Sequence, residues 1–246
     1  MEYKIAAKIC PQNFARALVL ERFINEFDKV EDLPNELKVG VLGGGRDDPE
    51  IQALRAIKRK LHVRTIGLYP SDVHLNLDEI LLDEHSLEKF DLILCSQVLE
   101  HIWNHNNFFV NLNSLLAEGG LVWLAAPATN HPHGSPDFYS PGFTHSYLKQ
   151  NLENNNFQVI SSGSIGSKRL YYAATFLARW LTVAEHQSPL TEIIKPSNIV
   201  KNFYYKSRIF HLMLVKFLSP KVSCDTRFVT ESWALAVNLT QTNLDD

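Results

Sequence analysis

One segment, 89–124, constrains the fold of this chain more than any other. Apolar residues fill 90–95 apart from Asp91, and the polar pair Ser96-Gln97 follows at once. Such a run, bounded by polar residues, is typical of a parallel strand that helices cover on both faces. An amphipathic stretch then leads to Gly119-Gly120, where we expect a helix to stop, and a second apolar run occupies 121–125. The segment therefore predicts a strand, a helix and another strand, with a ligand-binding edge where the first strand ends.

The rest of the chain alternates between strand-like and helix-like segments in the same way. We expect strands at 38–42, 63–68, 73–77, 90–95, 121–125, 157–161 and 226–240, and helices at 11–29, 49–57, 108–116 and 144–153. Thr144 is the expected cap of the last of these helices. Alternation with short links predicts an α/β fold: a mostly parallel, seven-stranded sheet with helices on both faces.

Two strongly aromatic helices, expected at 169–185 and 199–218, interrupt this rhythm before the last strand. We interpret them as a helical cap inserted over a ligand pocket; the alternatives are a homodimer face, or a basic second helix that lies on a membrane surface. The chain is then one domain. Its expected parts are an N-terminal helical segment at 1–37, a core sheet at 38–163 and 222–241, and the helical insertion at 164–221.

The composition is that of an ordinary globular domain and narrows the range of partners. Hydrophobic residues make up 45% and charged residues 21%, and the net charge is −3. No dense Lys/Arg run occurs, so we expect no nucleic-acid partner, and the aromatic helices lack an apolar stretch long enough to span a membrane. The three cysteines (Cys10, Cys95 and Cys224) are far apart, and the start of the chain lacks signal-peptide features. Reduced thiols and a cytoplasmic location are therefore expected.

Three motifs resemble one enzyme family. They are 90–101 (FDLILCSQVLEH), 116–120 (LAEGG) and 125–127 (AAP). In this order they resemble the fourth strand, the following helix and the fifth strand of class I S-adenosylmethionine-dependent methyltransferases, and the resemblance covers roughly 38–163, with a weaker match at 226–239. It implies a Rossmann-like fold, S-adenosyl-L-methionine as the cofactor and S-adenosyl-L-homocysteine as the product. The similarity to small-molecule and sugar methyltransferases implies a small-molecule or saccharide acceptor, methylated on a hydroxyl.

The resemblance also implies which residues hold the cofactor. They are Gly43, Gly44, Gly45, Arg46, Tyr69, Asn76, Leu77, Cys95, Ser96 and Gln97. The glycine-rich turn allows the backbone to approach the ligand closely. The sulfonium, amino-acid and ribose groups of S-adenosylmethionine need polar partners, and a ligand binds where parallel strands end and the sheet order reverses.

The chain departs from the family pattern at the acids that usually contact the cofactor. Val41 stands where the first motif has an acid, and Asp47 where it has a third small residue. Tyr69 replaces the acid that holds the ribose hydroxyls, and Asn76 the acid near the adenine. A tyrosine hydroxyl cannot accept two hydrogen bonds as a carboxylate does. Asp47, Asp48 and Asp72 would compensate if the turns were shifted by one or two residues.

The polar loop after the fifth strand, 128–142, carries the candidate acceptor residues. An oxygen nucleophile needs a base, and histidine is the commonest one. The resemblance implies that a loop of this kind faces the acceptor. We therefore predict His133 as the base, Asp137 as the residue that orients it, and His145 as a reserve base. The same side chains are equally compatible with turn caps, and with His131 they offer a metal site, which we do not expect because no cysteine is near.

Three functions are compatible with these patterns. The first is an active methyltransferase. The second is a catalytically inactive methyltransferase-like binding or scaffold protein, which the replaced acids favour. The third, a nucleotide-binding oxidoreductase, depends on the glycine-rich turn alone, and Gly43-Gly44-Gly45 does not fit the Gly-x-Gly-x-x-Gly pattern.

Overall fold

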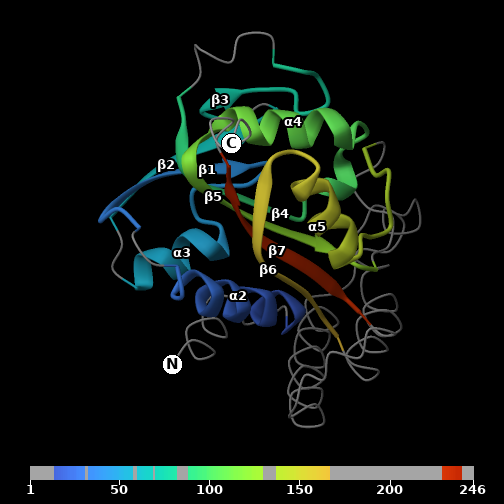
Figure 1. Cartoon of the computed structure of the whole chain (residues 1–246), viewed down its shortest axis with the longest axis horizontal. Helices are drawn as coiled ribbons and strands as arrows, with labels where there is room; N and C mark the ends of the chain where they lie inside the picture. The colour runs from blue at the N-terminus through green and yellow to red at the C-terminus, as the bar shows by residue number, and fades with distance from the viewer. Residues whose placement is uncertain are drawn as a thin grey trace, which may run out of the picture.

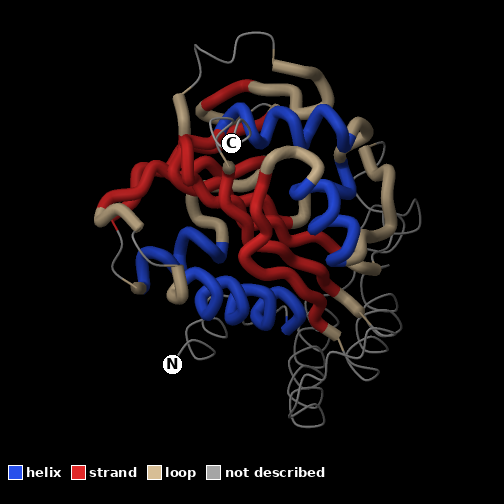
Figure 2. The backbone as a smooth tube through the Cα atoms, in the orientation of Figure 1, coloured by secondary structure: helices blue, strands red, loops and turns tan. Residues whose placement is uncertain are grey.

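The computed structural model describes residues 14–30, 33–57, 60–68, 70–81, 88–129, 137–166 and 229–239. A single sheet lies at the centre of this part of the chain, with helices packed against both of its faces (Figures 1 and 2). The two aromatic helices predicted at 169–185 and 199–218 lie outside the described residues. So do Tyr69, His131 and His133.

The sheet has seven strands in the order β3-β2-β1-β4-β5-β7-β6. The strands are β1 Glu36–Leu42, β2 Lys60–Gly67, β3 Val73–His74, β4 Phe90–Ser96, β5 Leu116–Pro127, β6 Phe157–Ile165 and β7 Glu231–Asn238. β1, β2, β3, β4 and β5 pair in parallel, whereas β7 runs antiparallel to both β5 and β6. The predicted α/β class is confirmed, but the sheet is mixed, because the last strand enters it in the reverse direction.

Within the described residues, four α-helices and one short 3-10 helix accompany the strands. They are α2 Phe14–Phe27, α3 Pro49–Ala56, η2 Leu99–His101, α4 His105–Leu115 and α5 His145–Glu153. Pro49 opens α3, where its missing N–H leaves no hydrogen bond unmade. The predicted Thr144 cap of α5 is confirmed, since its hydroxyl accepts from the Tyr147 N–H at 3.1 Å. β3 has only two residues, shorter than the expected 73–77.

Gly119-Gly120 lies inside β5 and does not stop a helix, contrary to the prediction. α4 already ends at Leu115, and Leu116 pairs with Phe90 of β4. The register then shifts, so that Leu92 faces Leu121. A Cβ atom on Gly120 would lie 3.0 Å from the Phe90 carbonyl oxygen, and Gly119 has a φ of +69°. The two glycines therefore accommodate an irregularity of the strand.

Two hydrophobic layers enclose the sheet. One joins the sheet to α2 and α3, and the other joins it to α4 and α5. Along β4, Leu92 and Leu94 belong to the first layer and Ile93 and Cys95 to the second. Because side chains alternate along a strand, Ser96 continues the series that faces α2 and α3. This alternation determines which polar side chains meet at the end of β4.

Candidate functional site

The order of the sheet reverses between β1 and β4, which are neighbours in space but not in sequence. The chain leaves β1 for α3 on one face and leaves β4 for α4 on the other. In open α/β sheets, ligands bind in the crevice at the carboxyl ends of such a strand pair. The candidate site is therefore the edge formed by the glycine turn after β1 and by Ser96 and Gln97 at the end of β4.

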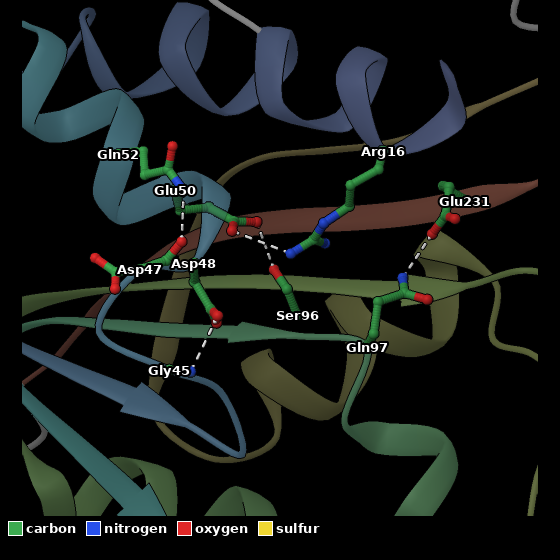
Figure 3. A network of polar contacts seen from close by, with 9 residues as sticks. All are labelled: Arg16, Gly45, Asp47, Asp48, Glu50, Gln52, Ser96, Gln97 and Glu231. Carbon is green, nitrogen blue, oxygen red and sulfur yellow. Dashed lines mark hydrogen bonds and ion pairs between the residues drawn. The ribbon is translucent and has the colours of Figure 1, made fainter. Parts of the chain in front are cut away.

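The turn after β1 requires glycine at its first two positions. Gly43 has a φ of +63°, and a Cβ atom there would lie 2.8 Å from Val98 Cγ2. A Cβ atom on Gly44 would lie 2.0 Å from Asp48 Oδ2. The Gly45 N–H donates to Asp48 Oδ1 at 3.0 Å (Figure 3). Asp48, which directly precedes α3, thus closes the turn, and burial raises the pKa of its carboxyl group.

A buried polar network joins three elements beside this turn. Arg16 of α2 donates to Glu50 Oε2 at 3.0 Å, and the Ser96 hydroxyl donates to Glu50 Oε1 at 2.7 Å (Figure 3). The side chain of Glu50 is 2% exposed and that of Arg16 is 13% exposed. Neither residue was predicted. A signal existed for Glu50, which lies on the same helical stripe as the buried Ala53 and Leu54.

A second carboxylate reaches the same edge from the last strand. Gln97 has a φ of +61°, its N–H donates to the Ala125 oxygen at 2.8 Å, and its side-chain amide donates to Glu231 Oε2 at 2.8 Å. Burial raises the pKa of Glu231 to about 7, and Glu100 adds to this, while Arg16 and Gln97 act in the opposite direction. Sequence reasoning missed Glu231, because the direction of β7 decides at which edge of the sheet its first residue lies.

The Cys95 side chain lies on the other face of the sheet from this network. It is 1% exposed within the layer that joins the sheet to α4 and α5. Burial raises the pKa of its thiol above the ordinary value. Of the predicted residues at the end of β4, Ser96 and Gln97 carry the polar contacts of the edge.

The acid of the turn after β2, Asp72, is bound by Thr65 and by Arg46, the residue that follows the glycine turn. Asp72 accepts from the N–H and the hydroxyl of Thr65 at 2.8 and 3.0 Å, and from Arg46 at 2.6 Å. These partners, the Thr65 N–H first, lower the pKa of Asp72 to about 2. The predicted residue Arg46 therefore ties the glycine turn to the turn after β2. Tyr69, the predicted ribose contact, lies outside the described residues.

The residues predicted near the adenine make contacts within their own turn. Asn76 donates to Glu79 at 2.8 Å and accepts from the Asp78 N–H at 3.1 Å. Leu77 is 5% exposed and packs in the layer beside α4. Asp47, one of the acids considered as a replacement, is exposed and pairs with Arg55 at 3.2 Å.

Of the predicted acceptor residues, Asp137 and His145 are described. The Asp137 carbonyl bonds to the His101 ring, and its carboxylate accepts from the Tyr139 hydroxyl at 3.3 Å. His145 Nδ1 lies 2.9 Å from the Ser164 hydroxyl, which lies 3.3 Å from that of Ser232. Asp137 and His145 thus bond to different partners. The pairing of Asp137 with His133 stays a prediction, since His133 lies outside the described residues.

The described part of the chain holds no group of three or more His, Cys, Asp or Glu side chains arranged to bind a metal ion. None of its described helices is both long and apolar enough to cross a membrane.

The fold is Rossmann-like, and comparison with known proteins identifies the family. A family model described as "Methyltransferase domain" matches residues 24–184. The chain therefore belongs to the methyltransferase-domain family. A search of curated protein sequences found no match.

Solved structures share the fold at low sequence identity. A putative sarcosine dimethylglycine methyltransferase from Galdieria sulphuraria has a TM-score of 0.57 and 10% identity, over 89% of this chain and 84% of that one. The [4+2]-cyclase SpnF has a TM-score of 0.53 and 11% identity, over 93% and 84%. Phosphoethanolamine N-methyltransferase 2 of Haemonchus contortus, in complex with S-adenosyl-L-methionine, has a TM-score of 0.52 and 12% identity, over 97% of this chain but only 57% of that one.

Proposed function

We propose that this protein is an S-adenosylmethionine-dependent methyltransferase that acts on a hydroxyl group of a small-molecule or saccharide acceptor. One observation carries the proposal: Gly43–Gly45, Ser96 and Gln97 form a polar edge at the switch point of a methyltransferase-domain fold. In the same fold, the Haemonchus contortus enzyme was solved with S-adenosyl-L-methionine.

The residues at this edge fit the cofactor. Gly43 and Gly44 lack side chains where the backbone must come close to a ligand. Ser96, Gln97, Arg16 and Glu50 supply polar groups for a ligand that carries both charges. When bound, S-adenosylmethionine supplies an electrophilic methyl group on a sulfonium.

The protein's own part in the reaction is to place the acceptor and take its proton. We assign the role of the base that takes the acceptor's proton to His133. Asp137 orients its imidazole, and His145 is the reserve base. Tyr139 and His101 hold Asp137, and Ser164 holds His145. Glu231 offers a further base, because a pKa of about 7 lies near the optimum for proton transfer at neutral pH.

A second candidate function is a methyltransferase-like binding or scaffold protein that does not use the cofactor. Val41 is fully buried at the position of the usual acid, and Asp72 is engaged by Thr65 and Arg46. A fold shared with a protein described as a [4+2]-cyclase does not by itself define the reaction.

Calorimetric titration of the full chain with S-adenosylhomocysteine separates the two functions. The methyltransferase should bind this product, and mass spectrometry of the denatured, freshly purified protein should detect S-adenosylhomocysteine carried through purification. Incubation with methyl-labelled S-adenosylmethionine and a panel of sugar and phenol acceptors then reports transfer. Absence of heat at millimolar ligand would exclude the methyltransferase and leave the binding protein.

A further inference from the structure

The Arg16–Glu50 ion pair lies at the switch point itself. Arg16 comes from α2, Glu50 from the first turn of α3 and Ser96 from the end of β4, so that the three side chains meet beside the carboxyl end of β4 (Figure 3). The contact between Arg16 and Glu50 joins residues 34 positions apart. Both charges are thus brought to the carboxyl end of β4 by the tertiary fold, not by local sequence.

Stability alone is a weak reason for such a pair. The removal of two charges from water is expensive, and well-packed apolar residues in place of a buried ion pair are often as stable or more so. The surroundings would accommodate apolar residues in place of this pair, since the neighbouring Ile51, Leu54 and Val41 are 0–1% exposed. A largely buried pair of opposite charges beside a ligand edge is better explained by a ligand that needs both.

The α-amino-acid end of S-adenosylmethionine is such a ligand, because it carries an ammonium and a carboxylate on one carbon. A guanidinium binds a carboxylate in a planar, charge-assisted pair. A carboxylate has about four acceptor positions, and Arg16 and Ser96 use one hydrogen bond each at Glu50. Glu50 thus retains the capacity to accept an ammonium N–H without losing its partners in the protein.

We propose that Arg16 and Glu50 bind the zwitterionic amino-acid end of S-adenosylmethionine, with Arg16 on its carboxylate and Glu50 on its ammonium. Glu50, from helix α3, then supplies the carboxylate that strand β1 lacks at Val41. Ser96 fixes the position of Glu50 from the end of β4. This inference rests on the proposed function.

Two ligands that differ only in the amino-acid end test the assignment. S-adenosylhomocysteine has that end, and 5′-methylthioadenosine lacks it while keeping the adenosine and a thioether. In Glu50→Gln, S-adenosylhomocysteine should bind roughly 10- to 100-fold more weakly, since hydrogen bonds to charged groups are of that strength. The affinity for 5′-methylthioadenosine should change by less than about twofold, because this ligand has no ammonium group for Glu50 to bind.

Control variants separate a binding role from a structural one. Asp47→Asn removes a neighbouring but exposed carboxylate and should change neither affinity. Glu50→Gln leaves Arg16 buried without its counter-charge, so the double variant Arg16→Met/Glu50→Leu is measured beside it. The double variant should still bind 5′-methylthioadenosine. It should bind S-adenosylhomocysteine no more tightly than 5′-methylthioadenosine.

The outcomes distinguish this inference from the proposed function. A wild-type protein that binds neither ligand overturns both. A wild-type protein that binds both ligands equally overturns only the role of the pair. An equal loss of both ligands in Glu50→Gln and in the double variant, with thermal unfolding shifted downwards, shows a purely structural cross-link and overturns the inference as well.

Discussion

The side-chain amide of Gln97 donates a 2.8 Å hydrogen bond to the carboxylate of Glu231, although 134 positions separate the two residues. The contact exists because β7 runs antiparallel to β5, so that the start of β7 meets the edge where β4 and β5 end. The antiparallel strand β7 therefore places the Glu231 carboxylate at this edge. In a sheet of parallel strands alone, the residues at the edge would come from the ends of those strands and the loops that follow them.

Glu231 makes the stability of the protein depend on pH. Its pKa is raised from 4.5 to about 7 in the folded chain, mainly by burial. Between these values the folded state holds a proton that the unfolded state has lost, so stability falls as pH rises through this window. Glu231→Gln removes the titration, and we expect the variant to match the wild type near pH 5 and to exceed it at pH 8 by about 1–3 kcal/mol.

Urea unfolding at the two pH values measures this difference. Glu153→Gln is the matched control, since Glu153 is exposed on α5 and forms an ion pair with Lys149 at 3.7 Å. The control should not change the pH dependence of the unfolding free energy. Equal pH dependence in Glu231→Gln and the wild type would show that Glu231 titrates normally.

The glycine turn predicts a contrast between two neighbouring positions. In Gly44→Ala, the new Cβ atom would lie 2.0 Å from Asp48 Oδ2 and 2.9 Å from Val41 Cγ1, so Asp48 must leave the turn. We expect a loss of about 1–3 kcal/mol of unfolding free energy, as for other overpacked sites, and weaker S-adenosylhomocysteine binding.

Gly45→Ala is the control for this contrast. A Cβ atom there would meet Asp48 Oδ1 at 3.6 Å, an ordinary contact. Its stability should lie within about 1 kcal/mol of the wild type, since Gly-to-Ala changes at compatible positions are mild. Equal destabilisation at both positions would mean that Asp48 does not close the turn.

Local sequence patterns defined the strands and one side of the site. The apolar run before Ser96 and Gln97 predicted β4 and its polar edge, and Thr144 predicted the start of α5, because these signals act over a few residues. The helix end predicted at Gly119-Gly120 was wrong, since a glycine pair that ends helices also permits an irregular strand. The helical stripe of α3 marked Glu50 as buried, but the contacts of Arg16, Glu50 and Glu231 depend on tertiary placement and strand direction, which no local pattern encodes.

The proposed base predicts a defect in turnover without a defect in cofactor binding. His133→Ala should lower kcat by about 10²- to 10⁴-fold, the usual contribution of a general base, and leave the affinity for S-adenosylhomocysteine unchanged. The measurement is transfer of labelled methyl to an acceptor found in the hydroxyl panel. His145→Ala is the comparison, and a larger loss there than in His133→Ala would reassign the base to His145.

The burial of Cys95 predicts an unreactive thiol. A thiolate is the nucleophile in thiol chemistry, and here the thiol is 1% exposed and its pKa is raised by burial. In a Cys10→Ser/Cys224→Ser variant, Cys95 should react with a thiol-specific reagent only as fast as the protein unfolds. S-adenosylhomocysteine should slow the reaction only through added stability, by the factor by which it lowers the unfolded population. Rapid alkylation of the native protein that the ligand blocks at once would instead place the Cys95 side chain at the ligand edge, beside Ser96, and would overturn its assignment to the core layer against α4 and α5.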